Sequence, residues 1–216
     1  MRPRLVEYFV ERLGTGLFVP DYAVMLSLAI VLGVWLCVRQ SERAGLEAGK
    51  VFRAAVVAVC AALVSARLYV VIQHWEHYGS DPADALSPWS GGLASYGAFL
   101  GGTLGLLLAA RRERLRVGEF LDACAPSLAL AVALGRVGCF LNGCCHGSLS
   151  GAAWAVRFPP GSDAQLEHAS AGLVGAGQSS LPVHPTQLYE SVFALALLFL
   201  LLAWRRRARR GLRVLP

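Results

Sequence analysis

This sequence contains few charged residues. Only 16% of its 216 residues are charged, whereas 56% are hydrophobic and the mean hydropathy is +0.52. A soluble domain carries about a quarter charged residues. Because the apolar residues also come in membrane-length runs, the composition excludes an ordinary soluble domain and predicts an integral-membrane protein.

The first residues lack the features of a signal peptide. No long apolar core follows the early arginines, no small-residue cleavage site is present, and two glutamates interrupt the stretch. Apolar side chains recur there at helical spacing, at Leu5, Phe9 and Leu13. We therefore predict a helix over residues 1–20 that lies at the membrane surface.

Five apolar runs are each near the length needed to cross about 30 Å of hydrocarbon. They cover residues 22–38, 51–72, 92–110, 120–140 and 188–204. No alternating period-2 pattern supports a β-barrel, so each run must satisfy its backbone groups as a helix. We predict an all-α, polytopic transmembrane helical bundle of about five spans, forming a single domain over residues 1–216.

Basic residues are scarce in one set of connecting segments. Residues 73–90 contain no Lys or Arg, and the long segment 143–183 contains only Arg157. The basic side chains gather instead after the first, third and fifth runs: Arg39, Arg43, Lys50, Arg53, Arg111, Arg112, Arg114, Arg116, Arg205, Arg206, Arg207, Arg209, Arg210 and Arg213. By the positive-inside tendency, we predict that the basic segments, including the tail 205–216, are cytoplasmic and that the N-terminus and the loop 143–183 face outward.

The net charge of +6 is therefore a sign of membrane topology. It is clustered between apolar runs rather than spread over one face, so we predict membrane lipids as partners and no nucleic acid.

The first polar segment, residues 135–147, places an arginine, an asparagine, a histidine and three cysteines at the end of an apolar run. Polar groups there are costly and invite a functional explanation. Arg136 presents a planar fork of donors that matches a phosphate, although it could also reach lipid headgroups or pair with a carboxylate. Asn142 could bond a substrate or cap the helix end.

The second polar segment, residues 184–190, opens the last apolar run. The imidazole of His184, with an ordinary pKa of about 6.5, suits proton transfer, but Pro185 after it also fits a simple helix start. Gln187, like Asn142, could bond a substrate or cap a helix end. Glu190 could act as a base, orient His184 or form half of an ion pair.

Two further groups leave alternatives open. Arg67, in the second run, could contact a substrate or pair with Glu190 or Asp122. The cysteines of the first polar segment do not follow a usual zinc spacing, so we predict no metal and leave a disulfide or simple packing open. The remaining cysteines are predicted to pack within or at the ends of spans: Cys37, Cys60 and Cys124.

The two polar segments, in this order and between spans, resemble the bacterial prolipoprotein diacylglyceryl transferases. The strong matches are residues 135–138, residues 140–143 with Gly147, and residues 184–190. Weaker matches are residues 66–68 and 96–102, and the resemblance covers about residues 21–204.

The resemblance implies an inner-membrane enzyme without a cofactor. It would move a diacylglyceryl group from phosphatidylglycerol to the lipobox cysteine thiol of a prolipoprotein signal peptide, releasing glycerol phosphate. We expect Arg136 to hold the phosphate and, from our own reading of the residues, His184 oriented by Glu190 to act as the base. Tyr96 is a further candidate catalytic residue. The candidate substrate-binding residues are Arg67, Asn142, Gly147, Gln187 and Tyr189.

This sequence departs from the family pattern at several places. The family commonly has asparagine where Cys139 stands, glutamate where Cys144 stands and histidine where Tyr96 aligns. It usually has a further span carrying an arginine and a glutamate one helical turn apart. We therefore expect a divergent member, short at its C-terminal end. Two other functions are compatible with the residues: a non-catalytic lipid- or lipoprotein-binding homologue, or a membrane thiol-redox protein.

Overall fold

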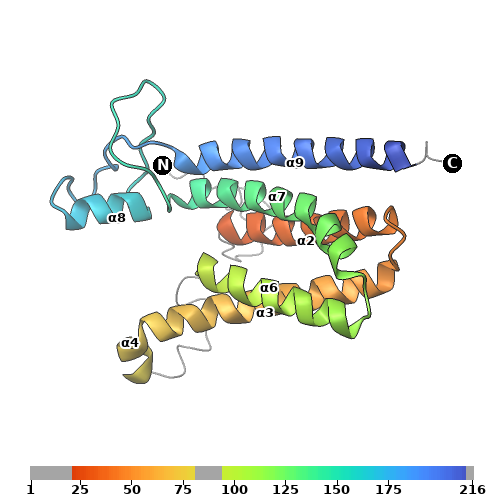
Figure 1. Ribbon diagram of the computed structural model, residues 1–216. Helices are drawn as coiled ribbons and strands as arrows, with labels where there is room; N and C mark the ends of the chain where they lie inside the picture. The colour runs from red at the N-terminus through yellow and green to blue at the C-terminus, as the bar shows by residue number, and fades with distance from the viewer. Residues whose placement is uncertain (1–20, 81–93, 213–216) are drawn as a thin grey trace, which may run out of the picture. The chain divides into compact units, whose positions relative to one another are not determined.

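The computed structural model describes residues 21–80 and 94–212, and every regular element in them is a helix (Figure 1). The helices are α2 (Asp21–Glu42), α3 (Ala48–Gln73), α4 (Trp75–Ser80), α6 (Ser95–Arg112), α7 (Val117–Asn142), α8 (Asp163–Ser170) and α9 (Thr186–Leu212). The only β pairing in the described residues consists of isolated bridges from Val183 to Leu149 and to Val156. The predicted all-α class is confirmed. The predicted surface helix at 1–20 lies outside the described residues.

Four helices of the described residues, α2, α3, α7 and α9, are long and apolar enough to cross a membrane. They contain four of the five predicted runs, and the chain is a multi-pass membrane protein. The remaining predicted run corresponds to α6, although its first residues lie outside the described part. Helix α9 continues through the predicted basic tail as far as Leu212, which agrees with the good helix propensity of arginine.

The chain divides into two compact units. The middle unit is Val34–Ala125, and the terminal unit combines Met1–Gly33 with Pro126–Pro216. The divisions fall inside α2 and inside α7, the second of them at Pro126, which lies within the helix. Formation of a single domain stays a prediction.

In the middle unit, α3 and α6 lie side by side because α6 presents glycines to α3 (Figure 1). A Cβ atom at Gly105 would lie 2.6 Å from the Cβ of Ala61, and one at Gly101 would collide with the side chain of Ser65. The glycine-rich run is therefore a close helix-packing surface, since small residues let two helices approach each other.

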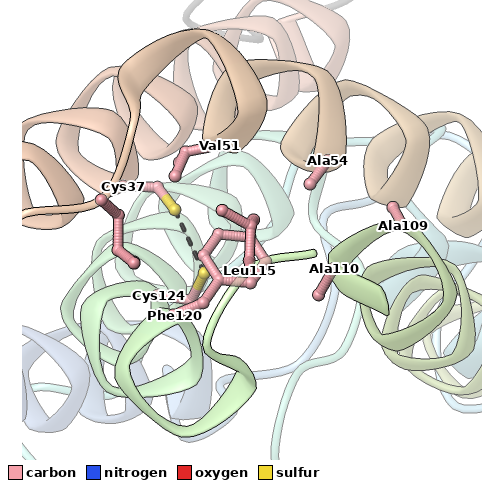
Figure 2. Packing of buried hydrophobic residues seen from close by; sticks show 9 residues of the cluster. Cys37, Val51, Ala54, Ala109, Ala110, Leu115, Phe120 and Cys124 are labelled. Atoms are coloured by element: carbon pink, nitrogen blue, oxygen red, sulfur yellow. Dashed lines mark hydrogen bonds between the residues drawn. The ribbon is translucent and has the colours of Figure 1, made fainter. Parts of the chain in front are cut away.

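The middle unit has an apolar cluster where α2, α3, α6 and α7 contribute side chains (Figure 2). Val51 and Phe120 have no exposed surface. The thiols of Cys37 and Cys124 are also buried, with their Sγ atoms 3.1 Å apart. Packing is thus confirmed for these two cysteines, whereas Cys60 is exposed.

In the terminal unit, α9 packs along α7 (Figure 1), where the Ser191 hydroxyl donates a 3.0 Å hydrogen bond to the Ala133 carbonyl. The loop between these helices is more ordered than the sequence suggested. The Gly, Ala and Ser content of residues 161–180 is typical of a mobile loop, but this stretch contains α8. The side chain of Ser162 caps α8 by accepting from the backbone N–H of Gln165, and Gln165 is only 1% exposed.

Candidate functional site

Four hydrogen bonds join the second polar segment to the first polar segment or to Ser148, the residue that follows it. Two are backbone bonds, and two come from side chains at the start of α9. They run from Gly147 N to His184 O (2.9 Å), from His184 N to Ser148 O (3.0 Å), from Thr186 Oγ1 to Cys145 O (3.0 Å) and from Gln187 Nε2 to Cys144 O (2.7 Å). Residues about 40 positions apart in sequence therefore form one local structure.

Glycine is required where these segments meet. A Cβ atom on Gly147 would lie 2.7 Å from Thr186 Cγ2 and 2.9 Å from His184 Cβ, which is too close for any side chain. At Gly143 the backbone has a φ of +76°, and its N–H bonds the Cys139 carbonyl at 3.0 Å. A left-handed glycine just after the last helical residue is a common way to end a helix, and here it turns the chain out of α7.

Arg136 on α7 faces Glu190 on α9. Arg136 Nε lies 2.7 Å from Glu190 Oε2, and the side chains are 32% and 47% exposed. The ion pair is therefore accessible from outside the protein. In the described part of the chain, no second ion pair holds the guanidinium, which leaves its terminal nitrogens able to bind an anion.

His184 has a different partner from the one we expected. Its Nδ1 lies 3.1 Å from the hydroxyl of Tyr189, and Trp154 Nε1 donates a 2.7 Å hydrogen bond to the same hydroxyl. The carboxylate of Glu190, which we expected to orient the imidazole, pairs with Arg136 instead. A chain of three aromatic rings thus holds His184 at the start of the second polar segment.

The two amides have different environments. Gln187 is completely buried, and its Nε2 group bonds the Cys144 carbonyl, so it joins the two segments. Asn142, the last residue of α7, is exposed. It lines a cavity of about 290 Å³ together with Phe140, Arg157, Phe158 and neighbouring residues. Asn142 can therefore present its amide to a bound molecule.

The structure also gathers three sulfur atoms beside this site. The Sγ atoms of Cys139, Cys144 and Cys145 all lie within 4.8 Å of one another. Contact with the Cys139 thiol, followed by burial, raises the pKa of Cys144 above its ordinary range. Burial is the largest cause that raises the pKa of Cys145. Sequence spacing alone did not show this cluster, because it forms only through the turn that ends α7.

A family model described as prolipoprotein diacylglyceryl transferase matches residues 12–215. The chain belongs to the prolipoprotein diacylglyceryl transferase family.

Curated relatives in this family carry the name phosphatidylglycerol–prolipoprotein diacylglyceryl transferase. The chain is 37% identical to the protein of Synechococcus elongatus over 196 residues, which cover 89% of this chain and 62% of the relative. It is 31% identical to the second such protein of Clostridium perfringens, with 91% of this chain and 72% of the relative covered. The Clostridium tetani protein is 31% identical, with 99% and 78% covered. The chain thus spans less than two thirds of the length of the Synechococcus relative and between 72% and 78% of the two Clostridium relatives.

Two candidate residues of this family member, Arg67 and Tyr96, belong to the middle unit. The guanidinium carbon of Arg67 lies 5.2 Å from the ring centre of Tyr78, a cation–π contact. Tyr96, in the first turn of α6, is 75% exposed. Their roles in binding or catalysis stay predictions.

Sequence reasoning did not assign Trp154 or His146 to the site. The indole N–H of Trp154 donates to the Tyr189 hydroxyl. His146 Nε2 lies 3.2 Å from Glu167 Oε2, which joins the first polar segment to α8. Tyr189 and Glu167 are both distant in sequence from the residues that they contact, so no local sequence pattern predicts these contacts.

Proposed function

We propose that this chain transfers a diacylglyceryl group from phosphatidylglycerol to the lipobox cysteine thiol of a prolipoprotein signal peptide. Membership of the family and the names of its relatives support this activity. The structural observation that carries the proposal is the accessible Arg136–Glu190 pair where the two polar segments meet. The proposal includes the bacterial inner membrane, with the N-terminus outside and the C-terminus in the cytoplasm.

The reaction requires a leaving group to depart as an anion. The acceptor sulfur forms a bond to the glycerol carbon of the diacylglyceryl group, and the bond from that carbon to the phosphate oxygen breaks. The electron pair stays on the oxygen of the departing glycerol phosphate. Arg136 stabilises that developing charge with its terminal nitrogens, while Glu190 holds the guanidinium through Nε.

The acceptor thiol must also lose its proton, because the thiolate is the nucleophile. His184 is the base in this proposal. When its Nδ1–H donates to the Tyr189 hydroxyl, Nε2 carries the free lone pair that takes the proton. Trp154 fixes the tyrosine by donating to the same oxygen.

The other candidates position these groups. Gly147 and Gln187 keep the two segments together, and Asn142 bonds glycerol or phosphate oxygens of the bound lipid. Arg67 remains a candidate substrate-binding residue and Tyr96 a candidate catalytic residue.

The decisive experiment is replacement of Arg136. The assay follows transfer of labelled diacylglyceryl from phosphatidylglycerol vesicles to a lipobox peptide by the purified chain. We expect Arg136→Gln to lower turnover by about 100- to 1,000-fold, the usual effect of losing a donor aimed at developing charge. Arg206→Gln, at an exposed position on α9, is the matched control and should retain full activity.

Two outcomes would contradict the proposal. Equal turnover by Arg136→Gln and the unmodified chain would remove Arg136 from the mechanism. Binding of phosphatidylglycerol by the unmodified chain without any transfer would support the non-catalytic lipid-binding alternative.

A further inference from the structure

The three-sulfur cluster has no role in the proposed transfer reaction. Cys139 lies in the last turn of α7, and Cys144 and Cys145 follow the turn that ends this helix. Their Sγ atoms lie within 4.8 Å of one another, and each can supply one soft ligand atom. Three such atoms in one place are enough to surround a small cation.

The backbone conformation here favours the cluster. The Cys144 N–H bonds the Cys139 carbonyl at 3.2 Å, which folds the chain back over the helix end. Cys145 then adopts a φ of +56°, a left-handed conformation that is uncommon for a residue with a side chain. Unfavourable conformations of this kind concentrate at functional sites.

The surrounding hydrogen bonds fix this turn. Gln187 and Thr186 bond the carbonyls of Cys144 and Cys145, so the backbone carrying two of the sulfurs is anchored to α9. Cys139 and Cys144 are half-buried, whereas Cys145 is exposed and leaves a route of entry. The cluster is therefore both held in place and accessible.

The donor set points to a particular ion. Thiolates select soft cations such as Cu(I) and Zn(II). Structural zinc sites almost always have four ligands, but in the described residues this group contains three sulfurs and no nitrogen or carboxylate donor. The nearby imidazole of His146 is already engaged by Glu167 and by the Gly147 carbonyl. A disulfide would use only two of the three sulfurs.

We propose that Cys139, Cys144 and Cys145 form a three-coordinate thiolate site for one Cu(I) ion. This inference does not depend on the transfer reaction, since the site is defined by its sulfur atoms alone. Binding would link the end of α7 to the segment that carries Gly147.

The test is a Cu(I) competition titration of the purified full-length chain in detergent, with reduced thiols and without oxygen. Cu(I) is supplied by a chromophoric chelator such as bicinchoninate. We expect the chain to remove one equivalent from the chelator and X-ray absorption to show three sulfur neighbours. Each serine replacement, Cys139→Ser, Cys144→Ser or Cys145→Ser, should weaken binding by more than about tenfold, because losing even an outer-shell partner costs that much.

Two controls address the other cysteines. Cys60→Ser removes an exposed thiol in α3, and Cys124→Ala breaks the separate Cys37–Cys124 pair. Both should retain the full equivalent. The proposal would be overturned if no Cu(I) left the chelator or if X-ray absorption showed only two sulfur neighbours. It would also be overturned by a fourth protein ligand with tighter binding of Zn(II), or by loss of Cu(I) binding in Cys124→Ala. X-ray absorption on the unmodified chain keeps the test valid if a serine variant fails to fold. Lipid transfer is not part of the readout, so failure here would not bear on the proposed enzyme activity.

Discussion

At Gly147 the two polar segments approach so closely that no side chain fits between them. Gly147→Ala places a methyl group 2.7 Å from Thr186 Cγ2 and 2.9 Å from His184 Cβ, so one backbone must move. Overpacking of this kind costs about 1–3 kcal/mol. If that strain separates the segments in the transition state, turnover falls by about tenfold or more, which the peptide transfer assay measures.

Gly151→Ala provides the control for this substitution. A Cβ atom at Gly151 meets no atom within 4 Å, so activity and thermal stability should be unchanged. If Gly147→Ala were as active and as stable as Gly151→Ala, the close approach would have no part in function.

The aromatic chain to His184 makes a second prediction at this scale. Tyr189→Phe removes the hydroxyl that contacts His184 Nδ1, and Trp154→Phe removes the donor to that hydroxyl. We expect each change to lower kcat by about tenfold and the double variant to be little worse than Tyr189→Phe alone, because residues in one hydrogen-bond network are not additive. Kinetics of the three variants measure this coupling. Additive losses would show that Trp154 acts independently of the tyrosine.

At the scale of single residues, the sequence identified candidate functional side chains better than it identified the residues that these side chains contact. Arg136, Glu190 and His184 stood out because charged and titratable groups are costly beside apolar runs. Their pairing did not follow from that cost, since Glu190 had several possible partners and only the α7–α9 contact brings it to Arg136. The hydrogen bond from Trp154 to Tyr189 joins residues 35 positions apart, and no sequence pattern predicts it.

Helix packing in the middle unit gives a prediction at the scale of elements. A Cβ atom at Gly101 of α6 would collide with the Ser65 side chain of α3, so Gly101→Ala must push these helices apart. We expect a loss of about 1–3 kcal/mol in stability, seen as a lower unfolding temperature in detergent. At Gly118, in α7, a Cβ meets nothing within 4 Å, and Gly118→Ala should be neutral or slightly stabilising. Equal unfolding temperatures for both variants would contradict the packing argument.

The sequence interpretation missed helix α8, although the sequence contains a local signal for the start of a helix there. Residues 162–165 read Ser-Asp-Ala-Gln, the spacing of a capping box at a helix start. The structure uses the first half of this motif, since Ser162 Oγ accepts from Gln165 N, while the Gln165 side chain accepts from Gly161 N, one residue before the cap. The surrounding Gly, Ala and Ser favoured a loop in our interpretation, and no apolar periodicity argued otherwise. A short helix fixed by its cap and by a buried amide escapes an analysis based on apolar runs.

For the whole molecule, the membrane class and four spans followed directly from composition and run length. These properties are local, because a span needs only about 20 consecutive apolar residues. Contacts between distant segments depend on tertiary packing, which is why the loop 143–183 proved more structured than its sequence suggested. The orientation of the spans rests on a different local quantity, the position of basic residues.

That orientation is the last prediction, and it determines which leaflet would supply the lipid in the proposed reaction. Fusions of a phosphatase that folds only in the oxidising outer compartment can be made after residue 177 and after residue 216. Position 177 lies in the outward-facing loop of our topology, and a Cβ there would meet no neighbour. We expect activity only from the first fusion, because the arginines that follow the last span favour the cytoplasm. The opposite pattern would put both polar segments on the cytoplasmic side, where Arg136 could reach only inner-leaflet headgroups. A secreted lipoprotein precursor would then have to present its cysteine before crossing the membrane, so this one measurement also decides the order of lipid attachment and export.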